Sequence, residues 1–343
     1  MNREKILSAL TAIVITTVVA FAAAVFSTDF LEAYGSGIFL ASPFVCGLIS
    51  VWIYNRKGKK HLRESIFVSF LAGCISLLAF LAFGFEGLIC LAMAFPVVVP
   101  FFILGGLVGF YISRAIGKRI YNDIIALILV AFIPLLMGFE SNEKKEPKIR
   151  TSITSVRIDA PIEIVWNEVI AFSKIDEPEE LLFRLGIAYP IDARIEGEGV
   201  GAVRYCNFST GSFVEPITHW EPNRKLAFDV LEQPHPMKEI SPFDHLHPTH
   251  LDWAVRSIRG QFILDYDEEG KVLLEGTTWF FAKMEPEPYW SWLTDSMIHM
   301  IHMRVLNHIK DSAESRANQS MVFNSRSCAS SVIHLYVLGR NEM

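Results

Sequence analysis

Five long apolar segments precede residue 140 of the chain. They cover residues 6–26, 37–54, 65–83, 88–112 and 124–139. A helix needs about 20 mostly apolar residues to cross a bilayer, and the first four segments meet that length comfortably. The fifth is shorter and contains Pro134. Because the segments are apolar on all sides, we interpret them as about five membrane-spanning helices rather than as core helices of a globular protein.

Basic residues alternate between the connections of this N-terminal region. Lysine and arginine occur before the first segment, in the second connection (residues 55–64) and in the fourth (residues 113–123), whereas the first and third connections contain only acidic charges. This pattern places the N-terminus in the cytoplasm. Five spans then put the C-terminal domain on the extracytoplasmic side. The basic residues at 144–150 oppose this arrangement, and a fifth segment that does not span would leave the domain cytoplasmic.

The first apolar segment also has features of a signal peptide. Arg3 and Lys5 precede it, and Ala22–Ala24 lies near a possible cleavage position. We favour an uncleaved anchor because the apolar stretch is long. No charged residue lies in the middle of any predicted span, so a transporter or channel is poorly supported and the region is interpreted as a membrane anchor.

The periodicity changes after a polar linker at residues 140–150. A strand is predicted at 152–158, and a helix from Asp159, as its cap, and Pro161 to about Phe172. A short helix follows at 179–185. Six further strands are predicted at 191–196, 201–208, 212–220, 225–231, 253–265 and 272–283. One long helix covers 289–317, and the tail at 318–343 is expected to be partly disordered. The pattern predicts an α+β domain at 151–317, in which a curved antiparallel sheet surrounds the C-terminal helix and leaves a cavity.

Several short motifs of this domain resemble the START-like, or SRPBCC, superfamily, which includes polyketide cyclase/dehydrase-type and lipid-transfer domains. They are Val156-Arg-Ile-Asp-Ala-Pro161 with Trp166, Gly199-Val-Gly201-Ala-Val-Arg204, Glu215-x-Ile217 and the Glu221-Pro222 strand exit. The resemblance covers residues 152–317 and implies a helix-grip fold with a deep pocket between sheet and helix. It implies an apolar or amphipathic small molecule as cargo. This fold hosts ligand carriers and several kinds of enzyme, so the resemblance leaves the activity open.

Charge excludes one class of partner. The whole chain has a formal net charge of −6, but residues 151–314 alone contain 14 Lys and Arg against 27 Asp and Glu, a net charge of −13. Nucleic-acid binding needs a basic surface, so we exclude it. The predicted partners are the lipid bilayer and an apolar small molecule, and the oligomeric state stays open.

The most conspicuous polar segment is rich in histidine. Residues 233–250 contain His235, His245, His247 and His250 among four prolines. Imidazoles this close in sequence are compatible with a transition metal, but the spacing matches no defined metal signature and the prolines indicate an irregular loop. We therefore predict that these histidines form a lid beside the pocket. We assign no metal and no cofactor.

Other candidates for the pocket lie on the predicted strands and the long helix. Asp295, His299 and His302 share one helix face, which would line the pocket or face solvent. A turn at Thr210-Gly211 would place Arg204 diagonal to Glu215 on one sheet face, as a ligand anchor if the face is inward and as a weak surface pair if outward. Aromatic and apolar pocket candidates are Trp253, Trp279, Trp290 and Met297.

Trp279 belongs to a polar set with Arg259, Gln261, Glu275 and Thr277, which alternation places on the side of two strands opposite their core residues. We expect this set to face solvent. The alternative is that it lines a site.

Familiar catalytic motifs are missing. The sequence has no nucleophile elbow, phosphate-binding glycine loop or dinucleotide fingerprint. Cys206 is the only cysteine of the domain, so a buried thiol is favoured over a disulfide with Cys328. We therefore expect a membrane-tethered binding or carrier protein. The alternatives are a cyclase, hydratase or lyase that uses pocket Arg, His and Glu, and a partner-binding scaffold.

Overall fold

The computed structural model describes residues 3–31, 34–56, 58, 61–115, 119–142, 146–243, 246 and 248–338. Its contacts divide the chain into two compact units. The first, helical unit comprises Met1–Lys148, Met237–Val255 and Ala282–Trp292; the second comprises Ile149–Pro236, Arg256–Phe281 and Leu293–Met343. Two segments from the predicted C-terminal domain therefore belong to the helical unit.

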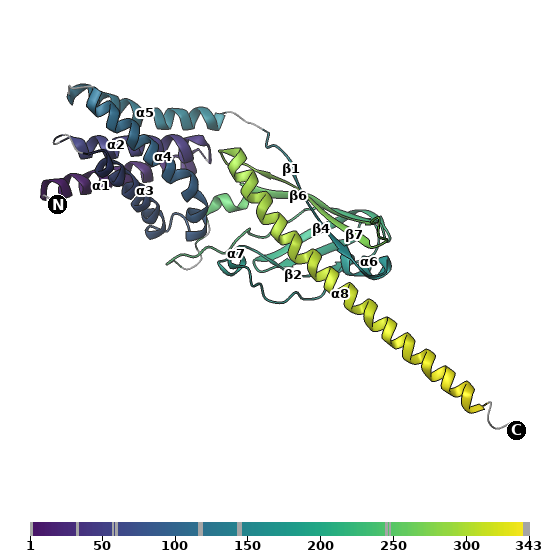
Figure 1. Ribbon diagram of the computed structural model, residues 1–343. Coiled ribbons are helices and arrows are strands. Elements are labelled where there is room, and N and C mark those ends of the chain that lie inside the picture. The colour runs from purple at the N-terminus through teal and green to yellow at the C-terminus, as the bar shows by residue number, and fades with distance from the viewer. Residues whose placement is uncertain are drawn as a thin grey trace. The chain divides into compact units, whose positions relative to one another are not determined.

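Five helices form most of the first unit (Figure 1). They are α1 (Arg3–Val25), α2 (Ser42–Asn55), α3 (Leu62–Ala82), α4 (Leu88–Ala115) and α5 (Arg119–Asn142), with the π-helical turns η1 (Phe26–Phe30) after α1 and η2 (Gly37–Ala41) before α2. Among the described residues, four continuous helical segments are long and apolar enough to cross a membrane: Arg3–Phe30, Gly37–Asn55, Leu62–Ala82 and Leu88–Ala115. The fifth predicted span corresponds to α5, in which the apolar stretch Leu127–Asn142 is shorter.

Glycines let α2 and α4 approach until their backbones touch. A Cβ atom on Gly47 of α2 would lie 2.0 Å from the carbonyl oxygen of Phe102, and one on Gly105 of α4 would lie 1.8 Å from that of Phe44. No side chain fits at either position. Close packing of small residues is the main attractive interaction between apolar helices in lipid, so these two glycines determine how closely the helices pack.

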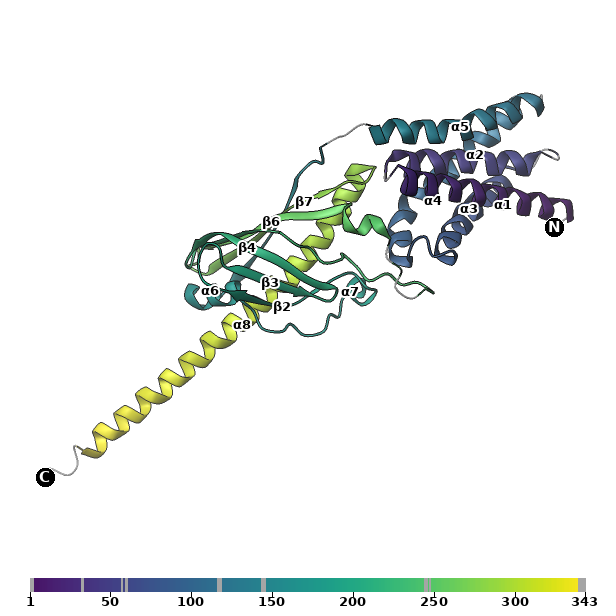
Figure 2. The same cartoon turned by 180° about the vertical axis from the view of Figure 1, so that it is seen from behind.

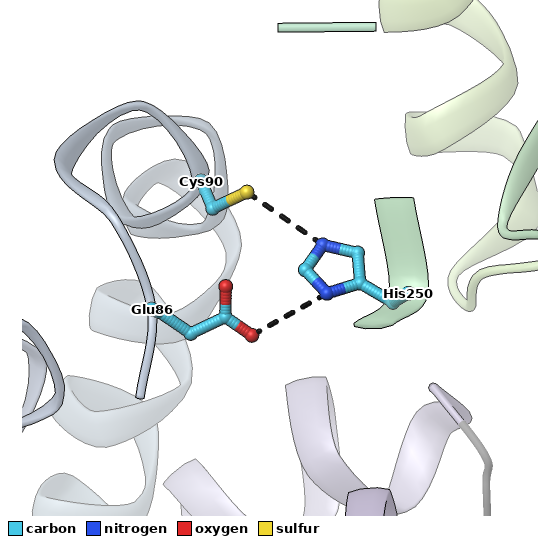
Figure 3. A group of neighbouring side chains, drawn as sticks. All are labelled: Glu86, Cys90 and His250. Atoms are coloured by element: carbon cyan, nitrogen blue, oxygen red, sulfur yellow. Dashed lines mark hydrogen bonds and ion pairs between the residues drawn. The ribbon is translucent and has the colours of Figure 1, made fainter. Parts of the chain in front are cut away.

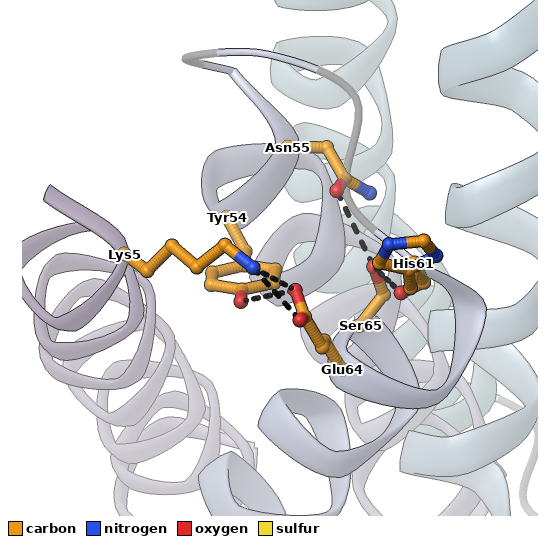
Figure 4. Close-up of polar contacts among 6 residues, drawn as sticks. All are labelled: Lys5, Tyr54, Asn55, His61, Glu64 and Ser65. Atoms are coloured by element: carbon orange, nitrogen blue, oxygen red, sulfur yellow. Dashed lines mark hydrogen bonds and ion pairs between the residues drawn. The ribbon is translucent and has the colours of Figure 1, made fainter. Parts of the chain in front are cut away.

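Polar contacts join one end of α1, α2 and α3 (Figure 4). Lys5 Nζ of α1 donates hydrogen bonds to Glu64 Oε1 and Oε2 of α3 at 2.8 and 3.0 Å, and the Tyr54 hydroxyl of α2 donates to Glu64 Oε2 at 3.2 Å. Ser65 Oγ donates to the carbonyl oxygen of His61 at 3.2 Å, which closes the first turn of α3. The three helix ends are thereby fixed at the edge of the apolar segments.

The second unit contains one seven-stranded sheet in the order β1-β7-β6-β5-β4-β3-β2. Its strands are β1 (Arg150–Ile158), β2 (Pro190–Glu196), β3 (Val203–Phe208), β4 (Gly211–Glu221), β5 (Lys225–Asp229), β6 (Val255–Tyr266) and β7 (Val272–Ala282). The five strand pairs with an assigned register are all antiparallel. All seven strands overlap the predicted ones, which confirms a curled antiparallel sheet followed by a helix.

The long helix α8 (Glu287–Leu338) lies across one face of this sheet, in front of it in Figure 1 and behind it in Figure 2. Leu306 and Ile309 of α8 are fully buried in a core with Leu274 of β7 and Leu226 of β5. The helix α6 (Ile162–Ile170) adds Val165, Trp166 and Val169 to the same core, and α7 (Leu181–Arg184) is a single turn.

Two local predictions were wrong. The last helix does not end near residue 317 but continues to Leu338, because no glycine or proline interrupts it between Pro288 and Gly339. The N-cap of α6 is Pro161, and no side chain forms a capping hydrogen bond there. Asp159 lies too far from the helix to cap it, and its backbone N–H instead donates to Glu314 Oε1 at 2.9 Å.

Substituting Gly105 tests the contact between α2 and α4. Gly105→Ala places a methyl group against a backbone oxygen, so we expect the melting temperature of the detergent-solubilised chain to fall, with a loss of about 3 kcal/mol at the upper end of typical overpacking costs. Gly138→Ala in α5 is the matched control, because its Cβ atom would have no neighbour within 4 Å. Equal melting temperatures of Gly105→Ala and Gly138→Ala would contradict the close approach of α2 and α4.

Candidate functional site

Arg204 and Glu215 form a buried pair on the side of the sheet that faces α8. They lie directly opposite each other on β3 and β4, not diagonally as predicted, because Phe208 pairs with Gly211 and the turn consists of residues 209–210. Gly211 is the first residue of β4 rather than a turn residue, and its φ of 146° favours glycine. The turn therefore lies one residue earlier than the predicted Thr210-Gly211.

Aromatic rings surround the Arg204 side chain, which is 1% exposed. Its guanidinium carbon lies 5.7 Å from the ring centre of Phe172 and 5.5 Å from those of Phe228 and Phe262. Cation–π attraction at these distances stabilises a charge that has left water. Arg204 therefore faces inward, and its role as a ligand anchor stays a prediction.

Hydrogen bonds use only part of the guanidinium. Arg204 Nη1 donates to Glu215 Oε2, and Nε donates to the carbonyl oxygen of Ile170 at 3.3 Å. Nη2 is buried and has no hydrogen-bond partner among the described residues. Burial by itself would lower the pKa of Arg204, but Glu215 raises it above its usual range, so the guanidinium stays charged. The neighbouring Cys206 is a free buried thiol whose pKa burial raises to about 12.

A second polar group on this side of the sheet is centred on His302 of α8. Its Nδ1 lies 3.1 Å from Thr154 Oγ1 of β1, and its Nε2 lies 2.8 Å from Thr278 Oγ1 of β7. Thr154 Oγ1 also lies 2.8 Å from Nδ1 of His299. Burial, assisted by His299, lowers the pKa of His302 to about 4, so the ring is neutral and can both donate and accept a hydrogen bond.

The remaining pocket candidates do not all join these groups. Met297 is half-buried on α8. Trp279 lies on the opposite side of β7, where the Arg259 guanidinium is 4.4 Å from its ring centre. Trp253 and Trp290 belong to the helical unit, where their rings lie 5.9 Å from Tyr34 and 5.1 Å from Phe39 respectively.

The histidine-rich segment is divided in the same way. His235 lies in the second unit, where its carbonyl oxygen accepts a hydrogen bond from Thr210 Oγ1 at 2.6 Å. His250 lies in the helical unit and is buried. His245 and His247 lie outside the described residues. The role of these histidines as a lid stays a prediction.

The segment of residues 237–255, which contains His250, contacts the start of α4. Glu239 accepts hydrogen bonds from the backbone N–H groups of Ile89 and Cys90, both at 3.0 Å, and the carbonyl oxygen of Ile240 accepts one from Leu88 at 2.9 Å. A carboxylate at a helix N-terminus satisfies free amides and interacts favourably with the helix dipole. Gly87 is required here, because its Cβ atom would lie 2.0 Å from Glu239 Oε2.

Next to this cap, His250 lies between a thiol and a carboxyl group (Figure 3). Its Nε2 is 3.6 Å from Cys90 Sγ, and its Nδ1 is 3.6 Å from Glu86 Oε1. The Tyr34 hydroxyl donates to Glu86 Oε1 at 3.0 Å, and the Tyr34 ring centre lies 4.4 Å from that of His250. Burial raises the pKa of Glu86 to about 8.

Sequence reasoning missed Glu86 and Cys90. The only available signal was their spacing of four residues, which straddles the start of the fourth apolar segment. His250 lies 160 residues after Cys90, and nothing local in the sequence connects them.

Comparisons with known proteins concern the fold. No family model matches the chain, and no curated protein matches it. The Zhui aromatase/cyclase from Streptomyces sp. R1128 aligns with 49% of this chain and 96% of its own at 16% identity, with a TM-score of 0.33. The di-domain ARO/CYC BexL of the BE-7585A biosynthetic pathway aligns over 61% of both chains at 15% identity and a TM-score of 0.33. The Aha1 dimer from Colwellia psychrerythraea aligns with 48% of this chain and 96% of its own at 12% identity and a TM-score of 0.28.

The cost of the buried pair can be measured by removing one partner or both. Glu215→Leu leaves the Arg204 charge buried and unpaired, so we expect a loss of about 3–5 kcal/mol. The double variant Arg204→Met/Glu215→Leu removes both charges and should recover most of that loss. Pulse proteolysis of the full chain in urea, with fragments of residues 150–317 quantified, gives the two values. If Glu215→Leu were as stable as the parent, the pair would not be buried as described.

Proposed function

We propose that this chain is an integral membrane protein whose second unit binds an apolar or amphipathic small molecule between its sheet and α8. The observation that supports this most is the Arg204 guanidinium, which is buried among three phenylalanine rings and has one nitrogen without a partner among the described residues. Ligand sites combine apolar walls with a few oriented polar groups; here the three rings supply the apolar wall and Arg204 the polar group.

The chemistry of the site indicates the ligand's polar end. Arg204 Nη2 can donate to a carbonyl, hydroxyl or carboxylate oxygen, and the aromatic rings around it suit flat or hydrocarbon groups. The neutral His302, with the hydroxyls of Thr154 and Thr278, offers further donors and acceptors that carry no charge. A molecule with one polar end and an extended apolar body fits this combination.

For the membrane part, we propose that α5 is a fifth span. Its Ile133 and Met137 are buried against Val45 and Ile49 of α2, while Leu127 and Leu135 on its outer side are 71% and 70% exposed. Large apolar side chains at the surface of a helix suit contact with lipid. Five spans with a cytoplasmic N-terminus would place the second unit on the extracytoplasmic side.

The second candidate function is a cyclase-, hydratase- or lyase-type enzyme. The geometry of His302 favours it, because an imidazole with its two nitrogens 3.1 and 2.8 Å from the Thr154 and Thr278 hydroxyls can pass a proton from one group to another. An enzyme would convert the bound molecule, whereas a carrier would release it unchanged.

Native mass spectrometry of the full chain in lipid nanodiscs tests the binding proposal. We expect a small molecule, distinct from the nanodisc lipids, to be released from the parent chain. Arg204→Met/Glu215→Leu should retain at least about tenfold less of it, the equivalent of one lost charge-assisted hydrogen bond. Arg259→Met, on the other side of the sheet, is the matched control and should retain it. Equal retention by all three proteins, or no released molecule from any, would contradict the proposal.

A further inference from the structure

Glu86, Cys90 and His250 bring three different metal-ligating groups together in the helical unit. One donor atom from each residue lies within 4.8 Å of the other two. A thiolate, an imidazole and a carboxylate are the three ligand types that Zn²⁺ accepts, and a site with three protein ligands leaves one position open. None of these residues contributes to the Arg204 site, so the cluster needs an explanation of its own.

The spacing between the thiol and the imidazole, which a hydrogen bond joins, is also compatible with a shared metal ion. With zinc–ligand bonds of about 2.0–2.3 Å, neighbouring donors of a tetrahedral site lie about 3.3–3.8 Å apart. Cys90 Sγ and His250 Nε2 are separated by 3.6 Å, which falls in that range. The 3.6 Å between His250 Nδ1 and Glu86 Oε1 exceeds an ordinary hydrogen bond. Because Nδ1 and Nε2 lie on opposite edges of the imidazole ring, a metal ion on Nε2 would need the Glu86 carboxylate to turn toward the other two donors, which lie within 4.8 Å of it.

Burial gives the cluster a reason to take up a cation. The side chains of His250 and Glu86 are only 7% and 12% exposed. Glu86 Oε2 is buried without a hydrogen-bond partner among the described residues. Tyr34, His250, Cys90 and Glu239 surround the Glu86 carboxyl group, and none of them is a permanent cation. A divalent ion would compensate a buried carboxylate and thiolate at once.

Groups around the cluster hold the three ligands in place. Tyr34 donates to Glu86 Oε1 and packs against the His250 ring at an interplanar angle of 37°. Glu239 binds the backbone N–H of Cys90 itself, which fixes the first turn of α4. Metal sites depend on such hydrogen bonds to orient their ligands.

We propose that Glu86, Cys90 and His250 bind one divalent transition-metal ion, most simply Zn²⁺. The ion would link residues 237–255 to the start of α4, beside the Glu239 cap. Three protein ligands leave a fourth position for water or another small ligand. The site is independent of small-molecule binding by the second unit, so either proposal can fail without the other.

Metal binding can be tested on the full chain in detergent after removal of metals with a chelator. We expect one Zn²⁺ per chain in a titration against a competing chromophoric chelator. Cys90→Ser, His250→Gln and Glu86→Gln should each weaken binding by at least about tenfold, since even losing a supporting residue commonly costs that much. The matched controls Cys74→Ser and His61→Gln should leave it unchanged. Unchanged zinc affinity in all three ligand variants would overturn the proposal.

Cobalt gives a second measurement that does not depend on the folding of the ligand variants. Co²⁺ bound to a thiolate shows a sulfur-to-metal charge-transfer band. We expect this band in the parent chain and in a variant that retains Cys90 while Cys46, Cys74, Cys206 and Cys328 are replaced by serine. A parent chain without the band would exclude Cys90 as a ligand.

Discussion

The carboxylate of Glu239 at the start of α4 is the contact on which the helical unit and its buried cluster depend. It accepts hydrogen bonds from the amides of Ile89 and Cys90, which no residue of the helix itself can satisfy. The same contact brings residues 237–255, which connect β5 to β6, into the helical unit. His250 lies beside Cys90 and Glu86 in this segment. One capping interaction therefore couples the two parts of the sequence.

The two polar sites of the protein are buried for different reasons. Arg204 and Glu215 neutralise each other, and the surrounding rings and the Ile170 carbonyl reduce the cost of removing them from water. Replacing such a pair by apolar residues is often neutral or stabilising, so stability alone does not explain its presence. Glu86, in contrast, has no permanent cation among its described contacts. The first site suits an organic molecule and the second suits a metal ion.

Local patterns in the sequence predicted most of the fold. Four apolar segments, all seven strands and the long last helix follow from hydropathy and periodicity, because each is set by neighbours within a few residues. Pairing register was harder, since Gly211 could serve equally in a turn or at a strand end. Contacts between distant segments could not be predicted at all. Nothing near His250 in the sequence indicates Cys90, and Trp253 and Trp290 looked like pocket residues because aromatic side chains suit any apolar surroundings.

Hydrogen–deuterium exchange of the full chain in nanodiscs tests most directly whether residues 237–255 fold with the helical unit. The amides of Leu251, Trp253 and Ala254 donate hydrogen bonds within this segment and should be protected. In Glu239→Ala, loss of a helix cap worth about 1 kcal/mol should speed their exchange, and that of Ile89 and Cys90, by about five- to tenfold. Strands β6 and β7 should be unaffected, as should the whole chain in the exposed control Glu268→Ala. Unprotected amides at 251–254 in the parent chain, or protection unchanged by Glu239→Ala, would contradict this account.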